Sequence, residues 1–172
     1  TIDGMQGTGV YDDYLMDLPG AVDPGPGEVF VAQWRMRVDD VTPPPYDADP
    51  RVGFLSEQHR FASFVYSEGS VRELAAHQSI PIAPSIFHTY EYRSPDMLTY
   101  EFYVDGLLAF GGSTTFGVFG PRVAWGDGWT PSESRSTWDY VRFGVVPEPT
   151  GLGFALAFGI MAAPRRSRRV TC

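Results

Sequence analysis

The chain has 172 residues, enough for one domain with a hydrophobic core and a short tail. It carries 21 Asp and Glu against 13 Arg and no Lys, so its formal net charge is -8. A chain this acidic repels phosphate backbones and anionic lipid, which argues against nucleic-acid binding. The single cysteine, Cys172, is the last residue, so no disulfide can form within the chain. The first residue is Thr1 rather than Met, so we expect an upstream segment such as a signal peptide.

The body of the chain predicts β-strands, because apolar and polar side chains alternate and no window shows a helical period. Glycine (19) and proline (15) are frequent, as expected where turns separate many short strands. In chain order, we expect strands at residues 9–17, 28–38, 51–55, 60–66, 70–75, 79–82, 87–93, 97–104, 107–110, 122–126 and 137–145. One-sided burial of this kind predicts an all-β, two-sheet antiparallel sandwich.

Three of these strands show which side chains face the core. In EVFVAQWRMRV, from Glu28 to Val38, apolar residues fall on one face while Arg35 and Arg37 fall on the other. The inward positions are Phe30, Ala32, Trp34, Met36 and Val38 in this strand, Leu98, Tyr100, Phe102 and Val104 in a later one, and Val141, Phe143 and Val145 in the last.

The segments between strands carry turn-forming residues. Asp105-Gly106, between two apolar runs, is a strong hairpin signal. RSPDM at 93–97 predicts a turn that joins two aromatic strands. TPPPYDADP at 42–50 cannot be a central strand, because its prolines donate no ladder hydrogen bonds.

Two segments, FHTYEYRSPDMLTYEFYVDGLLAFGG at 87–112 and VAWGDGWTPSESRSTWDYVRFGV at 123–145, resemble a known class of fold. They are similar to the concanavalin A-like, laminin-G-type jelly rolls of bacterial secreted proteins. In that class a Tyr-Val-Asp-Gly strand turns back on itself, and a Trp-Asp-Tyr-Val-Arg strand closes the sheet. The resemblance implies a jelly-roll domain over residues 1–145. Such domains often bind glycan or protein, and some hold calcium.

A catalytic carboxylate pair is not expected. Glucan hydrolases of this fold use a Glu-X-Asp-X-Glu strand, which sets two carboxylates on one face, and no such run is present. The acidic pair Asp47 and Asp49 lies in the proline-rich loop. Glu91 and Glu101 face each other across the 94–97 turn in one possible register; the alternative is two solvated carboxylates on a sheet surface. We therefore expect no catalytic residue and no enzyme activity.

The three histidines also give no catalytic or metal motif. His59, His77 and His88 lack metal-ligand spacing, and no Gly-X-Ser-X-Gly elbow is present. We expect His88, next to Tyr90, to be a strand residue that is hydrogen-bonded in place.

The WGDGW segment at 125–129 is the candidate glycan site. Trp125 and Trp129 can stack on the apolar faces of sugar rings, and Asp127 can accept hydrogen bonds from hydroxyls. The alternative is that one or both Trp close the end of the sandwich and that Asp127-Gly128 is a turn.

Calcium is a further candidate ligand. Asp127 and Asp139, with Asp12 and Asp13, are oxygen donors of the required kind. Calcium needs six to eight oxygens from a defined loop, and no EF-hand pattern is present.

The C-terminal segment combines three features. Val146-Pro147-Glu148-Pro149 is followed by an uncharged, mainly apolar run at 151–163 and then by four arginines. As a helix this run would span roughly 20 Å, short against a hydrocarbon core of about 30 Å. A cluster of positive charge after an apolar segment holds that end in the cytoplasm, so we expect only a transient membrane contact.

This three-part tail, residues 146–169, resembles a PEP-CTERM sorting signal of bacteria that make extracellular polysaccharide. The resemblance implies export to the cell envelope or extracellular matrix. It also implies processing near Pro149 by an exosortase, a membrane-embedded cysteine transpeptidase, and leaves residues 170–172 as a short end. The residues that match the signal are Val146, Pro147, Glu148, Pro149, Arg165, Arg166, Arg168 and Arg169.

Together, these features predict an exported, non-catalytic module that binds a glycan or the matrix. A purely structural biofilm or envelope protein is the alternative, and a glycoside hydrolase is a more distant one.

Overall fold

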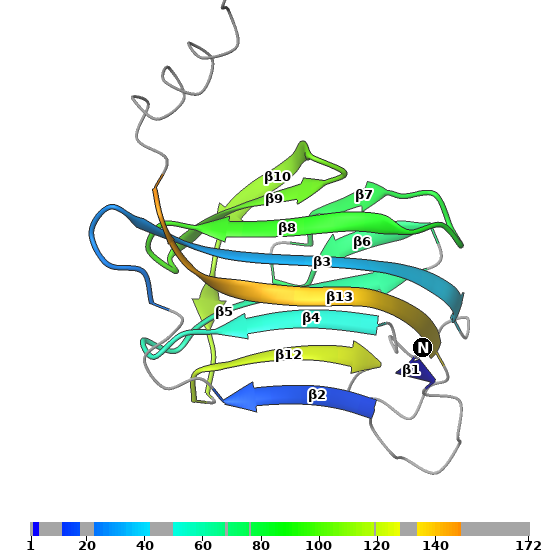
Figure 1. Ribbon diagram of the computed structural model, residues 1–172, viewed down its shortest axis with the longest axis horizontal. Coiled ribbons are helices and arrows are strands. Elements are labelled where there is room, and N and C mark those ends of the chain that lie inside the picture. The colour runs from blue at the N-terminus through cyan, green and yellow to red at the C-terminus, as the bar shows by residue number, and fades with distance from the viewer. Residues whose placement is uncertain are drawn as a thin grey trace, which may run out of the picture.

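The structure is a computed structural model that describes residues 2–3, 12–17, 23–41, 50–67, 69–75, 77–118, 120–127 and 134–148. All secondary structure in these ranges is β-strand, arranged in two antiparallel sheets packed face to face (Figure 1). The apolar segment at 151–163 and the four C-terminal arginines lie outside the described residues. Within the described part of the chain, no helix has the length and apolar character needed to cross a membrane.

Sheet A forms the front of the molecule in Figure 1. Its six strands follow the order β1-β13-β3-β8-β9-β10. Their bounds are β1 Ile2–Asp3, β3 Glu28–Val41, β8 His88–Ser94, β9 Thr99–Val104, β10 Leu107–Ser113 and β13 Ser134–Pro147.

Sheet B packs behind sheet A, with β5 and β6 lying behind β3 and β8 (Figure 1). Its main path is β2-β12-β4-β5-β6-β7, and β11 pairs with β5 beside this path. The bounds are β2 Asp12–Asp17, β4 Pro50–Leu55, β5 Arg60–Ser67, β6 Ser70–Glu73, β7 Ser79–Pro81, β11 Thr115–Phe116 and β12 Arg122–Asp127. The predicted two-sheet antiparallel sandwich is therefore confirmed.

The core between the sheets is largely aromatic. Trp34 of β3 is fully buried, and its indole N–H donates to the Tyr66 hydroxyl at 3.0 Å. Phe64 of β5 stacks on Phe102 of β9 with ring centroids 4.3 Å apart, so the two sheets meet ring against ring. The inward positions predicted for β3 are all buried, as are Tyr100 and Phe102; Val141, Phe143 and Val145 are partly buried and pack on this core.

Leu98 was expected to face inward and does not. It precedes β9 and is 39% exposed. The Asp96 carboxylate accepts hydrogen bonds from the N–H groups of Leu98 and Thr99 at 2.9 and 2.8 Å. This local turn holds Leu98 out of the strand, because the Asp side chain satisfies backbone donors that a ladder would otherwise use.

The eleven predicted strands are all present, and two two-residue strands, β1 and β11, were missed. The last strand is longer than predicted, since β13 begins at Ser134 and continues through Pro147. The apolar pattern does not predict the first residues of β13, because Ser134 and Ser136 are polar although both are buried.

The Asp105-Gly106 hairpin is confirmed. Both residues have positive φ, 51° for Asp105 and 81° for Gly106, as a type I′ turn requires. Leu107 pairs with Val104 on either side of it. This turn fixes the register of β9 and β10 at the edge of sheet A.

Candidate functional site

The outer face of sheet A, which we call the front face, places polar side chains of four strands in line. Arg142 of β13 lies opposite Gln33 of β3, Gln33 opposite Glu91 of β8, and Glu91 opposite Tyr103 of β9. Opposite residues in adjacent antiparallel strands are close enough for their side chains to interact. The register thus assembles a row from residues more than a hundred positions apart in sequence.

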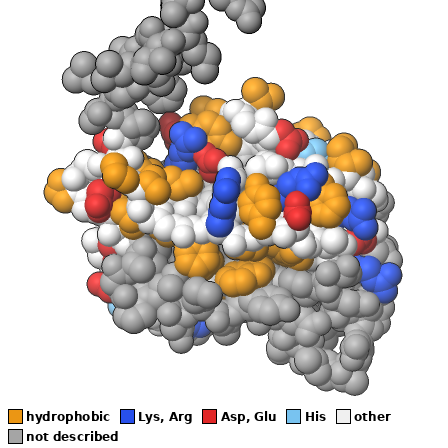
Figure 2. Space-filling model, in the orientation of Figure 1, with side chains coloured by type: hydrophobic (Ala, Val, Ile, Leu, Met, Phe, Trp, Pro, Cys, Tyr) orange, Lys and Arg blue, Asp and Glu red, His pale blue; other side chains and the backbone are white. Residues whose placement is uncertain are grey.

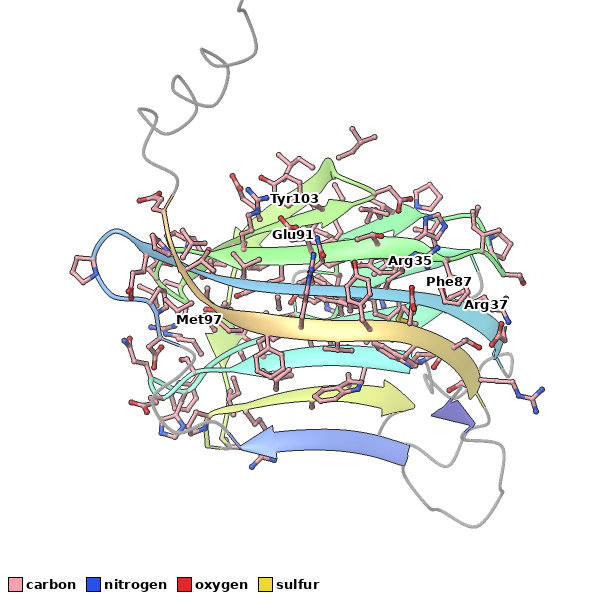
Figure 3. The ribbon with its side chains drawn as sticks, in the orientation of Figure 1. Arg35, Arg37, Phe87, Glu91, Met97 and Tyr103 are labelled. Carbon is pink, nitrogen blue, oxygen red and sulfur yellow. The ribbon has the colours of Figure 1, made fainter. Side chains whose placement is uncertain are left out.

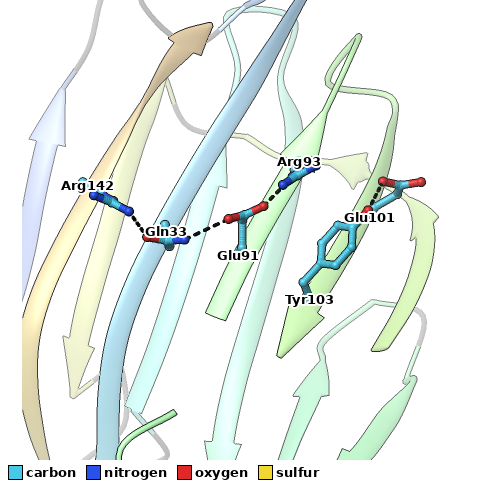
Figure 4. A network of polar contacts seen from close by, with 6 residues as sticks. All are labelled: Gln33, Glu91, Arg93, Glu101, Tyr103 and Arg142. Atoms are coloured by element: carbon cyan, nitrogen blue, oxygen red, sulfur yellow. Dashed lines mark hydrogen bonds and ion pairs between the residues drawn. The ribbon is translucent and has the colours of Figure 1, made fainter. Parts of the chain in front are cut away.

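Three of these side chains, Arg142, Gln33 and Glu91, form a hydrogen-bonded network (Figure 4). The Gln33 side-chain amide donates to the Glu91 carboxylate at 2.9 Å, and its oxygen accepts from Arg142 and, at 3.1 Å, from the Tyr140 hydroxyl. The Arg93 guanidinium donates to the other oxygen of Glu91. Because both ends of the amide are bonded, its orientation is fixed, and so is that of the carboxylate beside it.

Tyr103 and Glu101 form a second pair on the same face. The Tyr103 hydroxyl donates to the Glu101 carboxylate at 2.5 Å, and the Arg93 guanidinium lies 4.9 Å from the centre of the Tyr103 ring. The hydrogen bond to Glu101 and partial burial raise the pKa of the Tyr103 phenol. The phenol is therefore held protonated as a donor.

Two adjoining cavities open on this face, and together we call them the front hollow. The larger has a volume of 730 Å³ and the smaller 340 Å³. Val31, Glu91 and Val146 line both cavities. The remaining residues of the larger cavity are Val29, Arg93, Pro95, Thr99, Tyr100, Glu101, Pro147 and Glu148, and those of the smaller are Gln33, Arg142, Phe143 and Gly144. The lining combines apolar side chains with a few charged and polar ones, the composition usual for sites that bind small molecules.

A second cluster lies on the front face, away from Met97 (Figure 3). The guanidinium groups of Arg35 and Arg37 lie 4.7 and 5.1 Å from the centre of the Phe87 ring. Arg35 also forms an ion pair with Asp139 at 2.6 Å. Basic, acidic and apolar side chains consequently alternate across this face rather than forming a patch of one sign (Figure 2).

His88 holds a turn, which agrees with the hydrogen-bonded role predicted for it. Its Nδ1 lies 2.6 Å from the Asp105 carboxylate and its Nε2 lies 3.1 Å from the Ala83 carbonyl. The Thr89 N–H also donates to Asp105, at 2.8 Å. The His88 ring thus joins the loop that contains Ala83 to the β9–β10 turn.

The other two histidines, His59 and His77, have positive φ values of 58° and 56°.

Glu91 and Glu101 both lie on the front face but not opposite one another. Glu101 is opposite Arg93, and Glu91 is opposite Tyr103, so the two carboxylates are diagonal neighbours. The register in which they would face each other is therefore not the one formed. Each is bonded to a neighbouring side chain, Glu91 to Gln33 and Arg93, and Glu101 to Tyr103.

The residues proposed for glycan stacking are only partly described. Trp125 lies two residues after Val123 in β12 and therefore points to the same side of the strand. Val123 is fully buried, and Trp125 is partly buried and packs against the core. Trp125 therefore packs inward from the middle of β12, and its role in glycan stacking stays a prediction. Asp127 ends β12 opposite Asp12 of β2 and Pro50 of β4. The Asp127 side chain and all of Trp129 lie outside the described residues.

The calcium candidates are divided between the sheets. Asp139 lies in β13 of sheet A and is paired with Arg35, whereas Asp127, Asp12 and Asp13 belong to strands of sheet B. Among the described residues, no group of three or more His, Cys, Asp or Glu side chains is placed to hold a metal ion.

The outer face of sheet B carries a different surface, which we call the back groove. It encloses 290 Å³. Phe116 and Val118 are 71% and 78% exposed beside it, and Leu55 at its base is 2% exposed. Its lining is mostly apolar: Arg51, Gly53, Leu55, Phe61, Ser63, Leu74, Phe116, Gly117, Val118, Arg122 and Ala124.

Part of the predicted sorting motif is included in sheet A. Val146 pairs with Val29, and Pro147 pairs with Glu28 at the end of β13. The Glu148 N–H donates to the Gly27 carbonyl at 2.8 Å. Pro149 and the arginines of the motif lie outside the described residues.

Comparison with known proteins identifies the fold only. No protein-family model matches the sequence, and no curated protein matches it either. Among solved structures, the receptor binding domain of botulinum neurotoxin D matches with a TM-score of 0.52 and 11% identity, over 87% of this chain and 42% of that one. Sheep galectin-11 in complex with glycerol matches with a TM-score of 0.45 and 9% identity, over 78% of this chain and 98% of that one. The chain spans about two-fifths of the neurotoxin structure, and the likeness is one of fold.

The two sheets and the likeness to the neurotoxin domain define the fold alone. The chain is an all-β, two-sheet antiparallel sandwich that resembles concanavalin A-like folds, which confirms the fold expected from the sequence. The PEP-CTERM resemblance of the tail stays a prediction.

The front-face network was not predicted as a site. The alternation of β3 and β9 already placed Arg35, Glu101 and Tyr103 on an outer face. What the alternation does not give is which strand lies beside which. Only the strand order brings Gln33, Glu91 and Arg142 into one row.

Proposed function

We propose that this chain is a non-catalytic module of the cell envelope or extracellular matrix that binds a glycan in the front hollow. The observation that carries the proposal is the set of fixed polar groups that line the hollow beside apolar side chains. Sugar hydroxyls both donate and accept hydrogen bonds, and Glu91 and Glu101 supply acceptors while Arg93 and Arg142 supply donors. Tyr103 does not line the hollow itself, but its ring lies against Arg93, which does, and adds an aromatic surface for the apolar face of a sugar.

Pre-organisation supports binding at this surface. The side chains around the hollow are already bonded to one another, so a ligand would not have to order them. The two cavities also adjoin, which suits a ligand of several units laid along the sheet. A non-catalytic role is favoured because Glu91 and Glu101 are diagonal and each is bonded to a neighbouring side chain.

The delivery of the module is a second part of the proposal. Its support is the order of three features in the sequence: Val-Pro-Glu-Pro, the apolar run at 151–163 and the arginine cluster. In this proposal an exosortase processes the exported chain near Pro149. Intact mass of the protein recovered from the native surface tests this, and a C-terminus that still ends at Cys172 would contradict cleavage.

Binding is tested on a glycan array that includes the exopolysaccharide of the native host, with and without calcium. We expect binding that Tyr103→Ala weakens by about tenfold, the loss of one good contact. Phe116→Ala is the control, since it removes an exposed aromatic ring from the other sheet. Equal weakening by both variants, or no binding at all, would remove the proposal. Trp129→Ala tests the other candidate site: weaker binding by this variant alone would place the glycan at the WGDGW segment and not in the front hollow.

A purely structural role is the second candidate, and the back groove favours it. Exposed Phe116, Val118 and Leu74 form an apolar surface of the kind used in protein contacts. Loss of matrix cohesion in a deletion strain, with no glycan affinity in the purified chain, would support this role. Release of reducing sugar from the polysaccharide would instead support a hydrolase.

A further inference from the structure

The first three residues of the Val-Pro-Glu-Pro sequence are built into the folded domain. β13 pairs with β3 from Ser134 to Pro147, and the last two pairs are Val146 with Val29 and Pro147 with Glu28. The Glu148 N–H then donates to the Gly27 carbonyl at 2.8 Å. The backbone of this segment is therefore engaged along one side up to Glu148.

The acceptor for Glu148 is itself held in place. Gly27 lies in a turn with φ of 76°, in the left-handed region that glycine adopts readily. The Glu28 N–H donates to the Gly25 carbonyl at 3.0 Å, and the Glu28 carboxylate accepts from the Gly25 N–H at 2.9 Å. These reciprocal bonds fix the Gly27 carbonyl where Glu148 meets it.

The same three residues form a wall of the front hollow. Val146, Pro147 and Glu148 line the 730 Å³ cavity together with Arg93 and Glu101. The segment is thus laid against the surface of the domain and is not carried on a linker clear of it. Pro149 follows, and since proline has no N–H it cannot donate a further ladder bond.

We infer that the folded domain withholds Val146, Pro147 and Glu148 of the sorting motif and that the processing enzyme reaches them only when the end of β13 separates from β3. The inference rests on the proposed sorting function. An enzyme that grips an extended peptide needs its backbone groups, and here one backbone edge is already paired with β3 and bonded to Gly27. Strand ends open at low free-energy cost, so opening is frequent but must precede processing.

A disulfide staple tests the need for opening. Val29→Cys with Val146→Cys, in a Cys172→Ser background, joins directly opposite residues, whose spacing suits a disulfide. Val31→Cys with Gly144→Cys is the matched control, because it joins the same strands two residue pairs further inward and leaves residues 146–148 free to open. We expect the first staple to slow processing by about tenfold or more relative to the control in a host that has an exosortase.

Equal processing of the two oxidised variants would overturn the inference. Amide hydrogen exchange at Glu148 of the full chain is the second measurement, and we expect it to be slower than in an unstructured peptide. Exchange at the unstructured rate would also overturn the inference. If the chain without a staple is not processed in that host, the sorting proposal falls and this inference falls with it, whereas slow exchange at Glu148 would still establish the contact.

Discussion

The outer faces of the two sheets differ in how they are covered. Strand β8 of sheet A alternates between buried and more exposed positions along its whole length. Strands β4 and β5 of sheet B do not: Leu55, Ser63 and Val65 point away from the core between the sheets and are still 2%, 1% and 3% exposed. Sheet A is therefore buried on its inner face and solvent-exposed on its outer face, whereas part of sheet B is buried on both faces.

The cover on sheet B comes in part from the segment around β11. The Gly117 N–H donates to the His59 carbonyl at 2.7 Å, which holds the segment against the outer face. A Cβ on Gly117 would lie 2.6 Å from the Leu55 side chain and 3.2 Å from that of Phe61. This contrast predicts that side chains on the back face contribute more to stability than those on the front face.

The largest effect is expected from Leu55→Ala on the back face. The side chain is buried at the base of the back groove, so its removal leaves a cavity and lowers the free energy of unfolding by about 2–4 kcal/mol. Val31→Ala on the front face is the comparison, with a loss of about 1 kcal/mol because Val31 already borders open hollows. Urea denaturation measures both, and equal losses would contradict the contrast between the faces.

A smaller effect is expected when the same glycine-to-alanine change is made on each face. Gly117→Ala forces a methyl group onto Leu55 and Phe61 and lowers the free energy of unfolding by about 1–2 kcal/mol. At Gly144 of β13 nothing lies within 4 Å of an added Cβ. Gly144→Ala is therefore expected to be neutral or to stabilise by up to about 1 kcal/mol, because alanine loses less backbone entropy in a strand. Thermal denaturation of both variants measures the difference: we expect a lower melting temperature for Gly117→Ala and an equal or higher one for Gly144→Ala.

The front-face network is expected to contribute less still. Gln33→Ala removes the amide between Glu91 and Arg142 and lowers the free energy of unfolding by about 1 kcal/mol. Gln58→Ala, at an exposed position in a turn, serves as the control and changes stability by less than about 0.5 kcal/mol. A double-mutant cycle of Gln33→Ala with Arg142→Ala measures their coupling. A coupling energy of zero would show that the contact contributes nothing to stability.

The smallest effect is expected from pH, at the β9–β10 turn. Burial, the largest single influence, raises the pKa of Asp105, but the hydrogen bonds from His88 and Thr89 and the charges of His88 and Arg35 together lower it below the ordinary value. A lowered pKa stabilises the fold at pH values above the unfolded pKa, about 3.9, and this stabilisation is lost as pH falls through the folded pKa. The Asp105 side chain is 51% exposed, so the loss below about pH 4 is under about 1 kcal/mol.

Denaturation of wild type and Asp105→Asn across pH 2–7 tests this sign. In Asp105→Asn, the free energy of unfolding should fall less steeply below about pH 4 than in wild type. An unchanged acid limb would assign the loss to other carboxylates, with Asp96 next, since hydrogen bonds from Leu98 and Thr99 lower its pKa despite burial.

Most of the fold could be predicted from local patterns. Period-two alternation in β3 placed Trp34 and its neighbours inward, and the Asp105-Gly106 turn fixed one hairpin. The last strand shows where alternation alone is insufficient. Continuing the inward parity of Val141, Phe143 and Val145 toward the N-terminus would bury Asp139.

A β-bulge resolves that conflict. The register of β13 shifts between Trp138 and Tyr140, so Trp138 packs against the core while Asp139 points out to Arg35. Nothing in a single sequence sets the position of such a bulge or the order of strands in a sheet. The candidate site depends on that order, because its residues come from β13, β3, β8 and β9. It could not be assembled without the structure.

The ring-on-ring core has an optical consequence. Phe64, Phe102 and Phe110 form a continuous stack with interplanar angles of 15° and 18°, and Trp34 lies at 21° to the neighbouring Tyr90. Aromatic rings fixed in a chiral arrangement give a near-ultraviolet circular dichroism signal that disappears when packing becomes fluid. Trp34 has no exposed surface, so its fluorescence should resist quenching by acrylamide until the sandwich opens. The domain thus carries an intrinsic spectroscopic reporter of its packing.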